Sequence, residues 1–354
     1  MDRYIISGIQ QVGIGVSDVK AGFNWYNKHL GMDIPVFEEA AEANLMLPYT
    51  GGMPHKRHAI LAINMKGGGG FEIWQYTSRT PQAPAFRPQL GDLGLLCAKI
   101  KTENITLTHA FLKSKQVKIL SEINSNPAGK RHFFIEDPFE NLFEIIEDNA
   151  WFGKGLQETG GPVGMIMGVS NIDRSLKFYA DLLGYDRILY KGEDTYKDLS
   201  ALPGGDKRLK RAIITHSKER EGPFAKLFGN SYLELIEAVD YKSHKIFENR
   251  YWGDLGFIHL CFDIKNMAAL KVACEKAGHP FTIDGGAGFE MGEAKGHFTY
   301  IEDPDGSLIE FVETKKIPIM KKWGWYLDLK KRAPEKPLPD WMLKALKFNR
   351  KKAE

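Results

Sequence analysis

The sequence predicts an α+β fold in which one unit, a strand followed by a helix and three further strands (βαβββ), occurs four times. Three pairs of matching segments predict this repeat. They are VSDVKAGFNWYNKHLGMD (16–33) with VSNIDRSLKFYADLLGYD (169–186), LGDLGLLCAKI (90–100) with WGDLGFIHLCF (252–262), and RHFFIEDPFENLFEIIE (131–147) with GHFTYIEDPDGSLIEFVE (296–313). Because the pairs occur in the same order in both halves, the chain is predicted to be a tandem duplication.

Local patterns predict the elements of each unit in order. Residues 5–17 form the first strand, and an amphipathic helix follows, with Phe23, Tyr26 and Leu30 on one face and Gly31 at its end. Further strands follow, and the last of them is GFEIWQY (70–76). The second unit repeats this order, with a strand at 93–101, a helix near 104–115 and strands that end in the hairpin.

The hairpin of the last unit turns at Asp-Pro-Asp-Gly. Pro304 presets φ, and Gly306 can adopt a positive φ, so a tight turn is expected there. A repeated unit needs the same turn, which explains its recurrence without any catalytic role.

The repeats set the predicted domain boundaries. The N-terminal domain covers residues 1–150 and contains the units at 5–77 and 92–148, and a linker follows at 151–161. The C-terminal domain covers 162–314 and contains the units at 162–238 and 254–314. Residues 315–354 form a basic tail, with a short helix expected at about 341–351 and Asp340 as its cap.

Composition narrows the possible partners. With 43% hydrophobic residues, no membrane-length apolar run and no signal peptide, we expect a cytoplasmic protein whose three cysteines are reduced. The tail carries thirteen Lys or Arg against four Asp or Glu. Apolar residues interrupt these charges, so we expect the tail to pack across the fold and to bind neither nucleic acid nor a membrane. We expect a monomer or a homodimer.

The motifs resemble a known family. V-S-D before an amphipathic helix ending in L-G, followed by D-P-D-G and an apolar-Glu-apolar strand, is similar to the vicinal oxygen chelate superfamily, which includes glyoxalase I, extradiol dioxygenases and bleomycin resistance proteins. The resemblance covers residues 5–314. It implies that the units pair into curved mixed sheets around a cavity, where residues of the first and last strands of each unit hold a divalent metal ion.

The resemblance assigns one candidate ligand to the first strand and one to the last strand of each unit. The assigned residues are, unit by unit, Gln11 and Glu72, Leu95 or Cys97 and Glu144, Gly164 and Glu234, and His259 and Glu310. The residue types support a site independently, because a carboxylate within an apolar strand is costly to bury unless it is paired or binds a cation.

Which units pair decides which ligand sets form. Pairing the first unit with the second, or the third with the fourth, gives incomplete sets. Pairing the first with the fourth gives Gln11, Glu72, His259 and Glu310, the set of Gln-type glyoxalase I enzymes. We therefore expect one live site there and a degenerate site between the second and third units.

The expected function is a metal-dependent lyase or isomerase similar to glyoxalase I. Zn, Ni, Co or Fe would chelate a small-molecule substrate through vicinal oxygens, and Glu72 or Glu310 would act as general base. A ring-cleaving dioxygenase is an alternative and needs a second imidazole, which His297 could supply. A non-catalytic binding or resistance protein is the other alternative.

Overall fold

The computed structural model describes residues 3–155, 157–286, 289–291, 294–320, 325–329 and 332–353. The first two units contain β1 (Ile5–Gly15), α1 (Val19–Leu30), β2 (Ile34–Glu42), η1 (Leu47–Tyr49), β3 (Lys56–Ile63), β4 (Gly70–Tyr76), β5 (Gly94–Thr102), α2 (Ile105–Ser114), β6 (Lys118–Ile119), β7 (Asn124–Ser125), β8 (Arg131–Glu136) and β9 (Leu142–Glu147). The third unit contains β10 (Thr159–Gly168), α3 (Ile172–Leu183), β11 (Arg187–Asp194), η2 (Lys197–Leu199), β12 (Leu209–Thr215), α4 (Ala225–Phe228) and β13 (Tyr232–Ala238). The last unit and the tail contain β14 (Gly256–Lys265), α5 (Met267–Lys276), β15 (Ile283–Asp284), β16 (Phe289–Met291), β17 (Ala294–Glu302), β18 (Leu308–Met320), β19 (Trp325–Asp328), α6 (Asp340–Lys344) and η4 (Ala345–Asn349).

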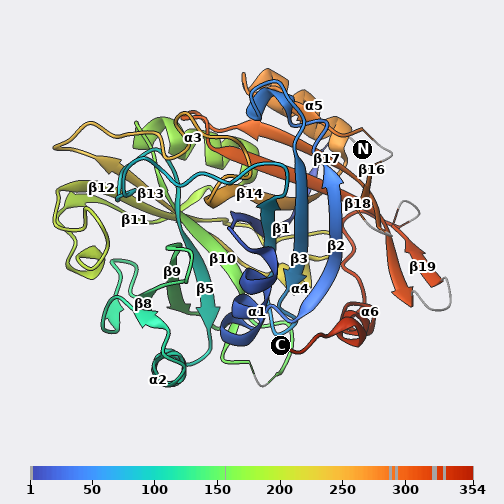
Figure 1. Ribbon diagram of the computed structural model, residues 1–354, viewed down its shortest axis with the longest axis horizontal. Coiled ribbons are helices and arrows are strands. Elements are labelled where there is room, and N and C mark those ends of the chain that lie inside the picture. The colour runs from blue at the N-terminus through green and yellow to red at the C-terminus, as the bar shows by residue number, and fades with distance from the viewer. Residues whose placement is uncertain are drawn as a thin grey trace.

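The strands form two mixed sheets, which confirms the predicted α+β class (Figure 1). The ten-stranded sheet has the order β15-β17-β18-β14-β1-β4-β3-β2, with β16 paired to β17 and β19 to β18, and it combines the fourth unit with the first. The nine-stranded sheet has the order β11-β12-β13-β10-β5-β9-β8-β6, with β7 paired to β8, and it combines the third unit with the second. The crossed pairing favoured from the ligand sets is therefore the observed one.

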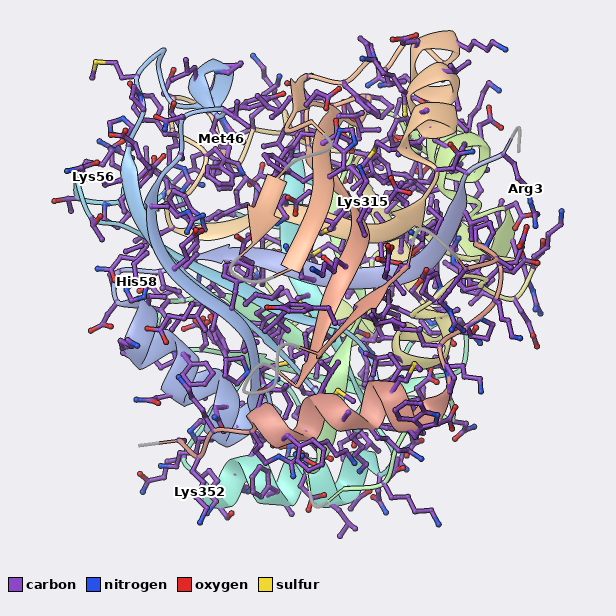
Figure 2. All side chains as sticks on the ribbon, turned by 90° about the vertical axis from the view of Figure 1, so that its right-hand side faces the viewer. Arg3, Met46, Lys56, His58, Lys315 and Lys352 are labelled. Carbon is purple, nitrogen blue, oxygen red and sulfur yellow. The ribbon has the colours of Figure 1, made fainter. Side chains whose placement is uncertain are left out.

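Antiparallel strand pairs join the units within each sheet. β1 pairs with β14 in one sheet, and β5 pairs with β10 in the other. Each last strand runs parallel to the first strand of its own unit, as β4 does beside β1 and β18 beside β14. This arrangement places the first and last strands of all units at the centre of a sheet, and Figure 2 shows how strongly the outer strands β2 and β3 curve.

The repeated V-S-D and V-S-N motifs begin the first helix of each half. The Asp18 side chain accepts hydrogen bonds from the backbone N–H groups of Lys20 and Ala21, and Asn171 caps α3 in the same way. Gly31 ends α1 with a φ of 65°, a conformation that glycine adopts without strain.

The Asp-Pro hairpin turns also connect the two sheets. Gly306 has a φ of 90°, as expected for the turn. Tyr26 on α1 donates a hydrogen bond to Asp137 in the hairpin of the second unit, and Tyr179 on α3 donates one to Asp303 in that of the fourth. Each bond crosses from one sheet to the other, because the helix and the hairpin belong to different sheets.

The described part of the tail packs against the fold. Leu329, Leu338 and Leu343 are buried in a cluster with apolar residues of the ten-stranded sheet and α4. Lys351, next to Lys352 as labelled in Figure 2, contacts α1 because its carbonyl oxygen accepts a hydrogen bond from Asn27, and Arg350 forms an ion pair with Asp33 just after that helix.

The predicted cap of the tail helix is wrong. The N-cap is Pro339, and Asp340 is the first helical residue, with its carboxylate paired to Lys226. Within the described residues no helix combines the length and apolar character needed to cross a membrane.

Candidate metal centre

Four adjacent central strands carry the predicted ligands. Gln11 lies on β1, Glu72 on β4, His259 on β14 and Glu310 on β18, and the sheet order β18-β14-β1-β4 makes these strands neighbours. The crossed pairing of units thus brings together side chains from the two ends of the duplicated region. We call these four residues the first cluster.

The polar atoms of the first cluster converge on one place. The ligand atoms of Glu72, His259 and Glu310 all lie within 4.8 Å of one another. His259 Nε2 is 3.1 Å from Glu310 Oε2 and 3.4 Å from Glu72 Oε2. Gln11 Nε2 donates hydrogen bonds of 3.2 Å to the same two carboxylate oxygens. The four side chains therefore surround a space that both acids border.

Gly13 leaves room for the imidazole of His259. Gly13 lies opposite His259 in the β1–β14 pair, and a Cβ atom there would lie 2.4 Å from His259 Cε1. Any side chain at this position would have to displace the ring. The glycine in QQVGIG therefore explains how a histidine fits between two strands of a packed sheet.

Aromatic side chains fix the orientation of His259. The Trp252 ring stacks on the imidazole with centroids 6.4 Å apart and an interplanar angle of 13°. The Tyr300 hydroxyl shares a hydrogen bond of 3.4 Å with Nδ1. Because Nδ1 is engaged by Tyr300, Nε2 is the nitrogen that faces the two acids.

Burial and charge shift the pKa values in opposite directions. Burial alone would lower the pKa of His259, but Glu310 and, more weakly, Glu72 raise it to about 9. Burial alone would raise the pKa of Glu310, but His259 lowers it below its ordinary value. Burial and the nearby carboxylate of Glu310 raise the pKa of the Cys261 thiol, so this cysteine is a neutral neighbour.

The donor atoms fit a divalent transition-metal ion. Gln11 Oε1 is buried and has no hydrogen-bond partner in the described part of the chain, and His259 Nε2 is paired only with the two carboxylates. Buried polar atoms are normally satisfied, so Gln11 Oε1 is an atom whose bonding a ligand would complete. A half-turn of the Gln11 amide would exchange Nε2 for Oε1 beside the two acids. An imidazole nitrogen, that amide oxygen and two carboxylates are donors that Zn, Ni, Co and Fe accept.

A cavity of about 440 Å³ begins beside the first cluster. Trp252, which stacks on His259, and Ile258, which precedes His259 in the chain, both line it. Its other apolar walls include Tyr49, Phe247 and Phe257. A small molecule in this cavity would be separated from His259 by the Trp252 ring.

His297 does not join the first cluster. Its Nε2 lies 2.5 Å from Asp284 Oδ1, on β15. The groups of potential metal ligands among the described residues include only one imidazole with Glu72 and Glu310. The second imidazole required by the dioxygenase alternative is therefore not supplied by His297.

The second and third units bring a different set of groups together. Glu144 and Glu234 are fully buried, and the Lys99 ammonium contacts both of them. Cys97 lies opposite Ile166 as His259 lies opposite Gly13, so Cys97 and not Leu95 holds the equivalent position. Gly164 supplies no side chain.

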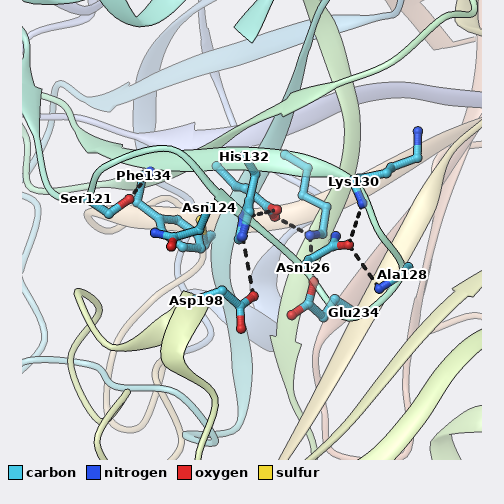
Figure 3. Close-up of polar contacts among 12 residues, drawn as sticks. Ser121, Asn124, Asn126, Ala128, Lys130, His132, Phe134, Asp198 and Glu234 are labelled. Atoms are coloured by element: carbon cyan, nitrogen blue, oxygen red, sulfur yellow. Dashed lines mark hydrogen bonds and ion pairs between the residues drawn. The ribbon is translucent and has the colours of Figure 1, made fainter. Parts of the chain in front are cut away.

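Three more residues complete this set, which we call the second cluster and which consists of Lys99, His132, Glu144, Asp198, Arg211 and Glu234. His132 lies between Glu144 and Asp198, with its nitrogens 2.8 Å and 3.4 Å from their oxygens (Figure 3). Arg211 pairs with Glu234 at 2.7 Å and with Asp198 at 2.8 Å. Burial alone would lower the pKa of His132, but the carboxylates of Glu144 and Asp198 outweigh this effect and raise it to about 9.

Sequence reasoning missed the basic members of the second cluster. The signal was present in GLLCAKIKT, where Lys99 and Lys101 follow the apolar Leu95 and Cys97 on one face of the strand. A lysine at such a position is rarely buried without an acidic partner.

Comparison with known proteins agrees with the fold. Glyoxalase I from Zea mays has a TM-score of 0.55 at 16% identity, with 86% of this chain and 92% of that chain covered. A putative dioxygenase from Bacillus subtilis subsp. subtilis str. 168 has a TM-score of 0.53 at 13% identity, with 87% and 86% covered. At these identities the likeness concerns the fold alone. No curated protein sequence matches the chain.

The family comparison covers both halves. Residues 8–145 and 163–311 match the description Glyoxalase/Bleomycin resistance protein/Dioxygenase superfamily. These two segments cover most of each of the four units and contain every residue of both clusters. With its duplicated units, its two mixed sheets and a candidate cation site on the central strands, the chain belongs to the Glyoxalase/Bleomycin resistance protein/Dioxygenase superfamily.

Proposed function

We propose that the protein is a divalent-metal-dependent enzyme with glyoxalase I-like lyase or isomerase chemistry, and that Gln11, Glu72, His259 and Glu310 hold the ion. One observation carries the proposal: the charge of the first cluster is unbalanced. Glu72 and Glu310 face the same imidazole, and in the described part of the chain neither forms an ion pair with a lysine or arginine. A dication beside a neutral His259 would balance the two carboxylates.

The ion would supply the electrophile. When bound there, Zn, Ni, Co or Fe would polarise two adjacent oxygens of a small substrate and lower the pKa of the C–H bond beside them. The residues of the chain would orient the substrate and move the proton.

Differences between the two acids support Glu72 as the general base. Glu310 Oε2 lies closer to His259 than Glu72 Oε2 does, and Glu310 also interacts with Cys261 and Tyr300. The Glu72 side chain is 11% exposed and the Glu310 side chain 7%. Glu310 is therefore the better fixed ligand, and Glu72 is the carboxylate with more freedom to accept a proton from a substrate.

The alternatives have less support. A ring-cleaving dioxygenase of this superfamily needs a second imidazole, and His297 is paired with Asp284 instead. A non-catalytic binding protein would hold the same ion, so only turnover distinguishes it from the enzyme.

Metal content tests the ligand assignment. We expect chain purified without chelator to contain Zn, Ni, Co or Fe at one ion per chain, and His259→Ala to lose it. His297→Ala is the matched control, because it removes an imidazole of the same sheet outside the first cluster. Equal metal content in all three proteins would exclude His259 as a ligand.

Proton exchange tests the chemistry. The metal-loaded protein is incubated in D₂O with the hemithioacetal of a 2-oxoaldehyde and, separately, with a 2-hydroxy ketone, and NMR follows deuterium at the carbon beside the oxygens. We expect Glu72→Gln to slow exchange by about 10²–10⁴-fold and Glu313→Gln, on the same strand as Glu310, to leave it unchanged. A metal-loaded protein that binds these compounds without exchange would be a binding protein.

A further inference from the structure

The two clusters occupy equivalent places in the two sheets. Glu72 and Glu310 lie on the strands that flank the β1–β14 pair, and Glu234 and Glu144 lie on the strands that flank the β10–β5 pair. The registers match as well. Glu72 pairs with Gly13 and Glu234 with Ile166, and these two partners face His259 and Cys97 across the central pair.

A single side chain takes the centre of the second cluster. Lys99 Nζ donates hydrogen bonds to Glu144 Oε2 and to Glu234 Oε2, the latter at 2.7 Å. All three residues are buried, with exposures of 1% for Lys99 and 0% for both acids. The ammonium therefore bridges the two carboxylates that correspond to Glu310 and Glu72 in the first cluster.

Gly164 makes this position accessible to the lysine. It lies opposite Lys99, and it is the residue that corresponds to Gln11 in the repeat. A Cβ atom at Gly164 would lie 3.0 Å from Lys99 Cδ and 1.9 Å from the carbonyl oxygen of Tyr232. A glutamine at this position would collide with the lysine stem, so this sheet cannot hold both the amide ligand and the lysine.

The acids of the second cluster are neutralised by bases of the chain, without an added ion. Its acids are Glu144, Asp198 and Glu234, and each contacts at least one of the bases Lys99, His132 and Arg211. The three bases match the three acids in number. The first cluster has two acids and one imidazole, so its charge is not balanced in this way.

We infer that the second cluster is a cation site occupied by the chain's own ammonium group: Lys99 Nζ takes the place of a dication between Glu144 and Glu234. The second site therefore binds no metal in the natural chain. Removing the ammonium, together with the space it fills, should convert the second cluster into a site for a divalent ion. The statement that the natural chain holds one ion rests on the proposed function, whereas the role of Lys99 does not.

A matched pair of variants tests the inference. Lys99→Ala removes both the charge and the volume, whereas Lys99→Met removes the charge and keeps the stem. Both are made in a His259→Ala background, so that ions at the first cluster do not contribute. The probes are Mn²⁺, Co²⁺, Ni²⁺ and Zn²⁺, each added alone. Metal stoichiometry, the thermal unfolding midpoint and the Co²⁺ absorption spectrum are measured.

We expect Lys99→Ala to gain one ion per chain, with an unfolding midpoint that rises by several degrees as the ion is added, because binding to the folded state alone stabilises it. We expect Lys99→Met to gain none, because the methionine stem leaves no room. If Lys99→Ala folds only when an ion is present, the inference holds.

The opposite outcomes are also defined. If Lys99→Ala binds no ion, or does not fold with any of the four ions, the cluster is not a cation site and the inference is wrong. Equal binding by Lys99→Met would place the ion elsewhere and would also overturn it. Because His259→Ala already disables the first cluster, none of these results depends on whether the proposed function is correct.

Discussion

The first and second clusters have two glutamates at equivalent positions. They differ at two pairs of residues that face each other across the central strands. Gly13 faces His259 in one sheet, and Ile166 faces Cys97 in the other. Gln11 faces Cys261 in one sheet, and Gly164 faces Lys99 in the other. In each pair a smaller residue faces a larger one. The larger residue of the first pair is on β14 in one sheet and on β10 in the other, and that of the second pair is on β1 in one sheet and on β5 in the other.

This exchange also moves the group that bridges the acids. Gln11 Nε2 bridges Glu72 and Glu310 from β1, whereas Lys99 Nζ bridges Glu144 and Glu234 from β5, the counterpart of β14. A buried acid needs a cation or donors, but folding does not require that the cation be a metal. The four glutamates therefore persist through the duplication, although only the first cluster has the donor set of a metal site.

The largest expected difference in stability is between variants of the two bridging residues, Lys99 and Gln11. Lys99→Met leaves Glu144 and Glu234 with fewer cations in a buried place, so we expect the free energy of unfolding to fall by about 3–5 kcal/mol. Gln11→Met removes neutral donors from Glu72 and Glu310, so we expect a loss of only about 1.5–3 kcal/mol. Denaturant unfolding at equal ionic strength measures both.

The neighbouring acids provide the control for this comparison. If charge imbalance causes the loss in Lys99→Met, adding Glu144→Gln should restore part of it, because one uncompensated acid is removed. Equal losses for the Lys99 and Gln11 variants would show that the ammonium is no more important than an amide.

The second cluster should also make the stability of the protein depend on pH, through His132. The pKa of folded His132 is about 9 against an ordinary value of 6.5, so its contribution is fully present below pH 6.5 and is lost as the pH rises through 9. We expect the stability advantage of the parent over His132→Gln to shrink by about 3 kcal/mol across that range.

Comparing variant with parent at each pH removes the other titrating groups from this test, His259 included. Thermal or denaturant unfolding from pH 6 to pH 10 provides the curves. Parallel curves for the two proteins would mean that His132 is not held in its charged form by Glu144 and Asp198.

Much of the fold could be predicted from the sequence because duplication makes weak local patterns repeat. Gly31, the V-S-D cap and the Asp-Pro turn each predict the boundary of a helix or strand. Because these motifs occur in the same order in both halves of the chain, they predict four units. The crossed pairing was reached through the ligand sets, since Gln11 and Glu72 lack an imidazole partner unless His259 lies beside them.

The second cluster could not be predicted in the same way. Its composition depends on the register between β5 and β10, which decides that Lys99 faces Gly164 and that Cys97, not Leu95, faces Ile166. Asp198 and Arg211 join from η2 and β12, and no repeat links them to Glu144. The Tyr26–Asp137 and Tyr179–Asp303 bonds were missed because turn chemistry alone accounts for the Asp-Pro motif.

The smallest effect is expected at these two tyrosines, which repeat between the halves but differ in their surroundings. Asp137 Oδ2 accepts hydrogen bonds from Tyr26 and from Asn141 Nδ2, whereas Asp303 Oδ2 accepts one from Tyr179 and no second one from the described part of the chain. Removing the tyrosine hydroxyl therefore leaves Asp137 with a second donor to the same oxygen. We expect Tyr26→Phe to cost about 1 kcal/mol and Tyr179→Phe about 1.5–3 kcal/mol in the free energy of unfolding, measured by denaturant unfolding of both variants and the parent at one pH.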